Sequence, residues 1–205
     1  MLDDYSQDYS SSLRKFEEML KTNFTYFFDA QEIEFIALHY IDFGKINLAK
    51  KAIKMGNRQH PNNINILLLK SEILILEDKL ESAKGILLFI DKIEPNNQDA
   101  YIQKATILSK LKKHEKSIEM LSECLKHSEY KFEVWHLIAM EFLTIGDFKK
   151  AMIYFKLCMK NEPNDHQVLY NLIYCIDNLS CYKDGIKILN DVLEKDPYNE
   201  LVWLE

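Results

Sequence analysis

Glycine and proline are scarce in this sequence, which has only five glycines and four prolines among 205 residues. Flexible and semi-rigid linkers are rich in these residue types, so no stretch of the chain has the composition of an interdomain linker. Hydrophobic residues make up 47% of the chain and charged residues 28%, as in a folded, soluble protein. We therefore expect one continuous all-α fold without an interior domain boundary.

Cysteine is also sparse, with four residues at positions 124, 158, 175 and 181. A disulfide framework or a zinc site would need paired spacings such as CxxC, and none is present. Free cysteine commonly fills small apolar spaces in a core. We expect that structural role for all four thiols.

Long apolar runs are missing, because no stretch approaches the roughly 18 uncharged residues of a membrane span. Residues 1–9 lack the positive start and apolar run of a signal peptide. We expect no membrane contact, and a cytoplasmic location if the chain begins at its natural N-terminus.

Catalytic motifs are absent as well: HExxH, GxSxG, GxGxxG and the Walker glycine loop do not occur. The six histidines are never three or four residues apart, the spacing that puts two metal ligands on one helical face. The sequence therefore predicts no enzyme, no metal site and no cofactor.

Clustered positive charge, which binding to nucleic acid requires, is almost missing from a chain of net charge -6. The exception is the cluster Lys110, Lys112, Lys113 and Lys116. It surrounds an expected turn and is typical of a solvated face, so we expect no nucleic-acid partner.

The few prolines that are present have a regular spacing. Pro61, Pro95, Pro163 and Pro197 are separated by 34, 68 and 34 residues, and Glu129 occupies the remaining slot. Small residues recur twelve positions before each slot, at Ala49, Ala83, Ser117, Ala151 and Gly185. Large residues recur eight positions before it, at Ile53, Leu87, Leu121, Phe155 and Leu189. Gly44 and Gly146 lie at the midpoint of their units, where a turn between two helices is expected, so each unit is predicted to be a helical hairpin.

The pattern resembles the tetratricopeptide repeat, most clearly over residues 132–165. The residues in the signature slots there are Trp135, Ala139, Phe142, Gly146, Phe148, Ala151, Phe155 and Pro163. The resemblance implies a right-handed superhelical solenoid of antiparallel hairpins. Its five repeats would be 30–63, 64–97, 98–131, 132–165 and 166–199. Repeat 98–131 departs most from the signature, and a bent or loosened junction is expected there.

The two ends of the chain differ from the repeats. Within the segment 1–29 we expect a helix over 12–21 and an aromatic run, Phe24 to Phe28, that together cap the first repeat. Residues 200–205 are predicted to start a sixth repeat, which suggests that the natural chain continues. Without a cap, Val202, Trp203 and the apolar face of 182–195 would face water and favour a homodimer.

The resemblance also implies a function, because the first helices of such hairpins line a concave groove that usually holds a peptide or helix. The groove positions carried over by slot are Glu34, Leu38, Ile41, Leu68, Glu72, Ile75, Ile102, Thr106, His136, Met140, Leu143, Tyr170, Tyr174 and Asp177. An acidic rim accompanies them, formed by Glu34, Asp42, Glu72, Asp99, Glu133 and Asp177. Charge complementarity favours a basic or amphipathic partner.

The leading hypothesis is a non-catalytic scaffold that binds a protein partner in this groove. Two alternatives stay open: self-association through the 182–205 end, and a regulatory module within a larger protein.

Overall fold

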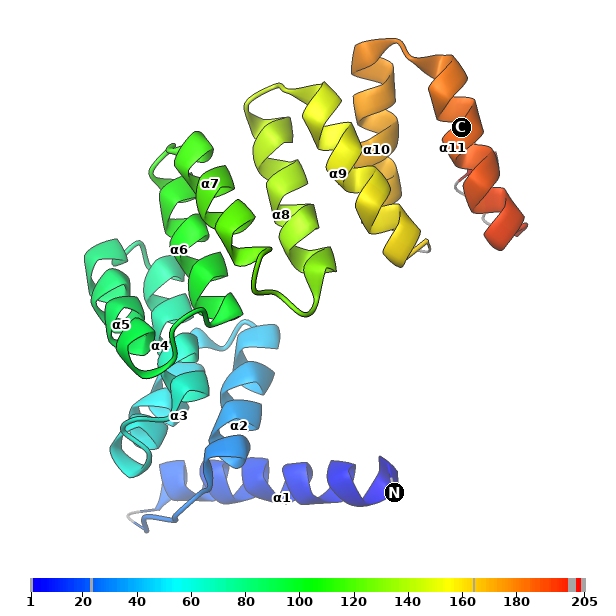
Figure 1. The fold of residues 1–205 in the computed structure, drawn as a ribbon. Coiled ribbons are helices and arrows are strands. Elements are labelled where there is room, and N and C mark those ends of the chain that lie inside the picture. The colour runs from blue at the N-terminus through cyan, green and yellow to red at the C-terminus, as the bar shows by residue number, and fades with distance from the viewer. Residues whose placement is uncertain (1, 23, 164, 199–201, 204–205) are drawn as a thin grey trace. The chain divides into compact units, whose positions relative to one another are not determined.

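The computed structural model describes residues 2–22, 24–163, 165–198 and 202–203, and within them every regular element is a helix (Figure 1). The prediction of an all-α fold is therefore confirmed. The chain forms two compact units, Met1–Gln103 and Lys104–Glu205, each of which is described by itself. The boundary between them lies inside repeat 98–131, the one that departs most from the repeat pattern.

Unit 1 contains α1 Leu2–Lys21, α2 Ala30–Asp42, α3 Ile46–Gln59, α4 Ile64–Leu76, α5 Leu80–Ile93 and the first half of α6 Gln98–Lys110. Unit 2 contains the rest of α6 and then α7 His114–Cys124, α8 Lys131–Thr144, α9 Phe148–Asn161, α10 His166–Leu179 and α11 Tyr182–Lys195. Within each unit, helices that follow one another along the chain pack side by side, as in the pairs α2 with α3 and α8 with α9 (Figure 1).

Side chains of Asp and Asn start several of the first helices of these pairs. Asp29 forms a capping box with Glu32 at the start of α2. At the starts of α4, α6 and α10, the side chains of Asn63, Asn97 and Asp165 accept hydrogen bonds from the backbone N–H three residues later. These caps satisfy donors that a helix start leaves unpaired, and so fix where each hairpin begins.

The turn inside each hairpin uses a residue in the left-handed region. These residues recur every 34 positions, at Gly44, Asp78, Lys112, Gly146 and Ser180. In each turn the next residue's N–H bonds the carbonyl five positions back, for example Lys113 N–H to Leu108 O at 2.9 Å. Together with the bond from the left-handed residue itself, this is the Schellman arrangement that closes helix C-termini. The sequence prediction of midpoint turns rested on two glycines, and the structure places the same turn at three further positions that lack glycine.

Replacing Lys112 with glycine is expected to raise the free energy of unfolding by up to about 1 kcal/mol, because the left-handed conformation strains a residue with a side chain. Lys112 has a φ of 61° and an exposed side chain. Urea denaturation of the variant would measure the gain. The reciprocal control, Gly146→Lys at a φ of 80°, should destabilise, and a loss of stability in Lys112→Gly would contradict this account.

The N-terminal segment is more helical than predicted, since α1 begins at Leu2 rather than at residue 12. The amphipathic pattern is visible only from about Leu13 onward, because that half of the helix packs against the core of unit 1. Phe16 and Phe28 are fully buried there with Tyr40. Their rings lie 6.4 Å apart, and Phe16 lies 5.8 Å from Tyr40.

Other aromatic residues of this segment do not belong to the cap. Phe24 and Phe27 are each 72% exposed, so only part of the predicted aromatic run covers the first repeat. The ring of Phe27 lies edge-on to His60 at 5.4 Å. The expectation that the whole run is buried was therefore wrong, since alternate side chains of this extended segment point away from α2.

The core of unit 2 follows the repeat slots. Ser117 and Ala151 are fully shielded from solvent, and Phe155 is completely buried. Ser117 donates to the carbonyl of Ala105 at 3.0 Å, which satisfies its hydroxyl where other repeats have alanine. A half-buried ion pair joins His114 of α7 to Glu141 of α8, with Nδ1 and Oε2 2.7 Å apart.

Three of the four cysteines, Cys124, Cys158 and Cys175, are buried in this unit, and Cys181 is partly exposed. Burial, reinforced by the charge of Asp165, raises the pKa of the Cys158 thiol to about 12. Burial raises the pKa of Cys175 to about 11. These thiols are packed in their protonated form, in line with the structural role expected of them.

At the C-terminal end, Trp203 is 69% exposed and donates its indole N–H to the carbonyl of Pro197 at 2.9 Å. Val202 is only 5% exposed, so the prediction that it faces water was wrong. Most of the predicted start of a sixth repeat, 200–205, lies outside the described residues.

Candidate peptide-binding faces

The first candidate site is an acidic face of unit 1. It consists of Glu34 and Asp42 on α2, Glu72 on α4 and Asp99 in the first turn of α6. Glu34 accepts a hydrogen bond from the Asn65 side chain at 2.9 Å. Within the part of the chain that the structure describes, none of the four carboxylates pairs with a lysine or arginine. The face therefore carries negative charge that the protein itself does not neutralise.

The pKa values of this face reflect that imbalance. Burial raises the pKa of Glu72, and the nearby carboxylates of Asp42 and Asp99 raise it further. The pKa of Asp99 is raised by burial first and then by Glu94 and Glu34. Like charges that are partly removed from water disfavour ionisation of one another. An approaching cation would relieve both effects.

Neutralising two of these groups, with Glu72→Gln and Asp99→Asn together, is expected to stabilise the protein at pH 7. A carboxyl group whose pKa is higher in the folded state destabilises that state above the folded pKa, and this effect vanishes below the unfolded pKa of about 4. Urea denaturation at pH 7 and at a pH below 4 would test this. The gain should be present at pH 7 and absent at the lower pH, and equal gains at both would contradict it.

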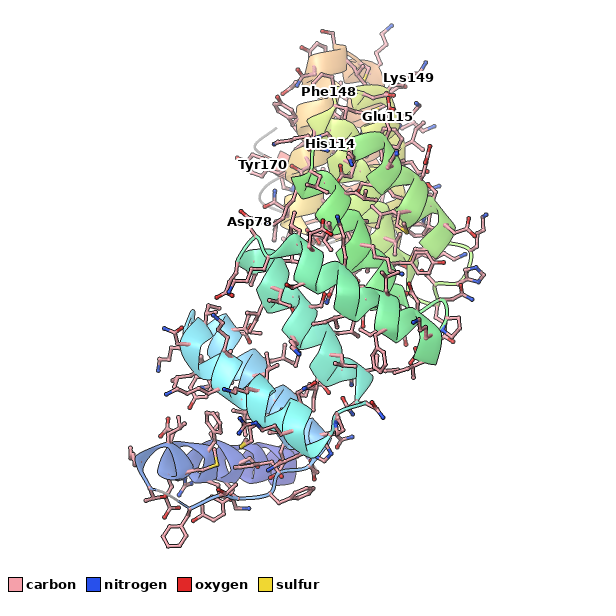
Figure 2. All side chains as sticks on the ribbon, turned by 90° about the vertical axis from the view of Figure 1, so that its left-hand side faces the viewer. Asp78, His114, Glu115, Phe148, Lys149 and Tyr170 are labelled. Atoms are coloured by element: carbon pink, nitrogen blue, oxygen red, sulfur yellow. The ribbon has the colours of Figure 1, made fainter. Side chains whose placement is uncertain are left out.

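The second candidate site is an aromatic face of unit 2, formed by Tyr170 and Tyr174 of α10 with Phe148 at the start of α9. Tyr170 is 57% exposed and Tyr174 52% exposed, and Figure 2 shows Tyr170 projecting away from α10. The rings of Phe148 and Tyr174 meet edge-to-face at 5.9 Å. Exposed tyrosine gives contact area together with a polar tip that stays in water.

The predicted groove residues divide by exposure. The exposed ones are Leu38, Thr106, Tyr170, Tyr174 and Asp177. The half-buried ones are Glu34, Ile41, Glu72, Ile102, His136, Met140 and Leu143. Leu68 and Ile75 are buried, at 6% and 4% exposure, so within the described structure they serve packing and offer little surface to a partner.

His136 is directed into unit 2 and not toward a partner. Its ring stacks on Phe132 at 6.5 Å and lies 6.1 Å from the buried ring of Phe155, and its Nε2 atom is shielded from solvent. The sequence prediction missed two neighbours of the aromatic face. Phe148 was assigned to a packing slot of the repeat, and Asn171, which donates to the sulfur of Met140 at 3.5 Å, was not considered. Their positions next to Tyr170 and Tyr174 on adjacent helices could be recognised only from the packing of α9 and α10.

Two structural searches found nothing in the described residues. No group of three or more His, Cys, Asp or Glu side chains there is arranged to hold a metal ion. No helix among them combines the length and apolar character needed to cross a membrane.

Comparison with known sequences identifies the repeats. Residues 98–128 and 132–165 match the family model of the tetratricopeptide repeat. A curated relative, the DnaJ homolog subfamily C member 3 homolog of Dictyostelium discoideum, is 25% identical over 145 residues, which is 63% of this chain. The chain spans only 29% of the length of that relative.

Solved structures with the same fold are numerous. Pseudomonas aeruginosa pilF has a TM-score of 0.68 at 14% identity, with 81% of this chain and 75% of that one covered. A thermophilic TPR protein of Thermus thermophilus has a TM-score of 0.67 at 19% identity, with 85% and 94% covered. YrrB, a TPR protein with an unusual peptide-binding site, has a TM-score of 0.53 at 14% identity, with 85% and 90% covered. At these identities the likeness shows the fold.

Proposed function

Because the chain belongs to the tetratricopeptide repeat family, we propose that it is a protein–protein interaction scaffold that binds a basic or amphipathic segment of a partner. Proteins of this fold are typically non-catalytic. The observation that carries the proposal is the acidic face of unit 1, where Glu72 and Asp99 have raised pKa values and the described residues supply no cation to pair with them. A peptide with lysine or arginine side chains would supply the missing charge.

The apolar part of such a segment has matching surface as well. Ile41 and Ile102 are half-buried on the same helices as the acidic residues, and Leu38 is 41% exposed. Side chains of this kind can hold leucine or valine between the charged contacts. In unit 2, the exposed Tyr170 and Tyr174 are suited to a second part of the segment or to another partner.

Binding of a fluorescein-labelled peptide that alternates lysine and leucine, followed by fluorescence anisotropy, would test this function. The Glu72→Gln/Asp99→Asn variant should bind the peptide at least about tenfold more weakly, because it loses two charge-assisted contacts. The matched control is Glu115→Gln/Glu119→Gln on the exposed surface of α7, which changes the charge equally. If both variants bind like the wild type, the acidic face is not the binding surface.

The same measurement has a pH signature. A cationic ligand favours the ionised carboxylates, so the peptide should bind more tightly as pH rises through the raised pKa range of Glu72 and Asp99. Affinity that does not depend on pH between about 4 and 7 would argue against contact with these groups.

A second candidate function is self-association through the 182–205 end. Tyr182, Ile186 and Trp203 are 57%, 61% and 69% exposed there, which is a large apolar surface for a chain end. Sedimentation equilibrium would then show concentration-dependent dimers that disappear with Trp203→Asp. A monomer at all concentrations would eliminate this function.

A further inference from the structure

A second pocket lies in unit 1, on a different face of α4 from Leu68 and Glu72. It has a volume of about 490 Å³ and is enclosed by α3, α4 and the turn before α5. We call it the basic pocket. Its residues on α4, which include Lys70 and Leu74, are offset from the acidic face by helical spacing. The two surfaces are therefore separate sites.

The charge of the basic pocket is opposite to that of the chain. Its lining has five cations and one carboxylate: Lys50, Lys54, Arg58, Lys70 and Lys79 against Glu77. The whole chain, in contrast, has a net charge of -6. A local excess of positive charge in a concave surface attracts anions even when the net charge of the protein is negative.

Internal pairing leaves part of this charge unused. Lys50 and Lys79 both bind the carboxylate of Glu77, the latter at 2.9 Å, and these hydrogen bonds lower the pKa of Glu77. Lys54, Arg58 and Lys70 form no ion pair within the described residues. Lys54 and Arg58 lie one turn apart on the exposed side of α3, so their charges are directed to the same ligand.

Beneath the cations the pocket has an apolar floor. Ile53 and Ile73 are each only 3% exposed, and Leu74 is half-buried. A ligand that bound through phosphate alone would gain nothing from this floor, whereas an apolar side chain would bury surface on it. A volume of this size suits one or two side chains of a peptide. The guanidinium of Arg58 can also bind a carboxylate through two parallel hydrogen bonds.

We propose that the basic pocket is a docking site for an acidic segment of a partner protein, in which carboxylates meet Lys54, Arg58 and Lys70 and an apolar side chain rests on Ile53, Ile73 and Leu74. This site is independent of the acidic face. The same unit then binds two partner segments of opposite charge, one on each face of α4.

The test uses a fluorescein-labelled peptide that alternates glutamate and leucine, with the full-length protein. Wild type should bind this peptide, and Lys54→Glu/Arg58→Glu should weaken binding at least about tenfold, since two attractive contacts become repulsive. Lys112→Glu/Lys113→Glu, in the other unit, changes net charge by the same amount and should bind nearly as the wild type does. Equal weakening by both pairs would mean a nonspecific charge effect and would overturn the proposal.

Further arms separate the remaining explanations. Lys54→Gln/Arg58→Gln avoids like-charge repulsion and serves if the reversed pair loses helicity. A glutamate–serine peptide of the same length should bind more weakly than the glutamate–leucine peptide, and equal affinity would rule out the apolar floor. Oligouridylate that bound more tightly than the peptide, and was lost with Lys54→Glu/Arg58→Glu, would make the site a phosphate surface and overturn the proposal.

The two sites can also be distinguished. Glu72→Gln/Asp99→Asn should leave binding of the glutamate–leucine peptide intact, while Lys54→Glu/Arg58→Glu should leave binding of the lysine–leucine peptide intact. Failure of one probe therefore does not decide the other.

Discussion

Replacing Phe155 with alanine is expected to lower the free energy of unfolding by about 3 to 5 kcal/mol. The phenyl ring is completely buried in α9, a helix that packs against both α8 and α10. Removing it leaves a cavity that its neighbours cannot fill, because the ring of His136 is already held by Phe132 at 6.5 Å. The cost would therefore combine lost apolar transfer with the cavity itself.

Urea denaturation followed by the fluorescence of Trp135, which lies half-buried on α8, would measure this loss. The control is Lys116→Ala on the exposed side of α7, which should change the free energy of unfolding by less than about 0.5 kcal/mol. A harmless Phe155→Ala would mean that the repeat register is misassigned in unit 2.

The second large effect is expected at the other end of the chain, where Phe16→Ala should also cost about 3 to 5 kcal/mol. Phe16 is fully buried, and its ring contacts those of Phe28 and Tyr40. It is the main anchor of α1 on the first hairpin. Its removal would expose the apolar side of α2, because terminal hairpins depend on a cap.

Hydrogen exchange of unit 1 amides would detect this loss, since both tryptophans of the chain, Trp135 and Trp203, lie in unit 2. Phe24→Ala is the matched control, because it removes the same ring from a position that is 72% exposed. If the amides of α2 are protected as well in Phe16→Ala as in Phe24→Ala, α1 is not a stabilising cap.

The repeat pattern was enough to predict the helical hairpins, because apolar and small residues recur at fixed offsets. It did not predict the left-handed residues Asp78, Lys112 and Ser180, since none of them is a glycine. Gly56 was missed for another reason. A Cβ atom there would lie 2.4 Å from the Cγ2 of Ile33, so α3 and α2 approach closely at a position outside the recurring small slots.

For the candidate sites, sequence reasoning identified helix faces but not what covers them. Leu68 and Ile75 were expected on a binding face, yet neighbouring side chains bury them. The basic pocket gave a partial signal, because Lys50, Lys54 and Arg58 recur every four residues on one side of α3. That Lys70 of α4 joins them became apparent only from the packing of the two helices.

The distribution of thiols makes the two units separable by chemical labelling. All four cysteines lie in unit 2, and three of them are buried there as protonated thiols. An alkylating reagent should modify Cys181 in the native protein and reach Cys124, Cys158 and Cys175 only when unit 2 opens. The labelling rate of these three would therefore time the opening of unit 2 alone, in the intact chain and without any engineered reporter.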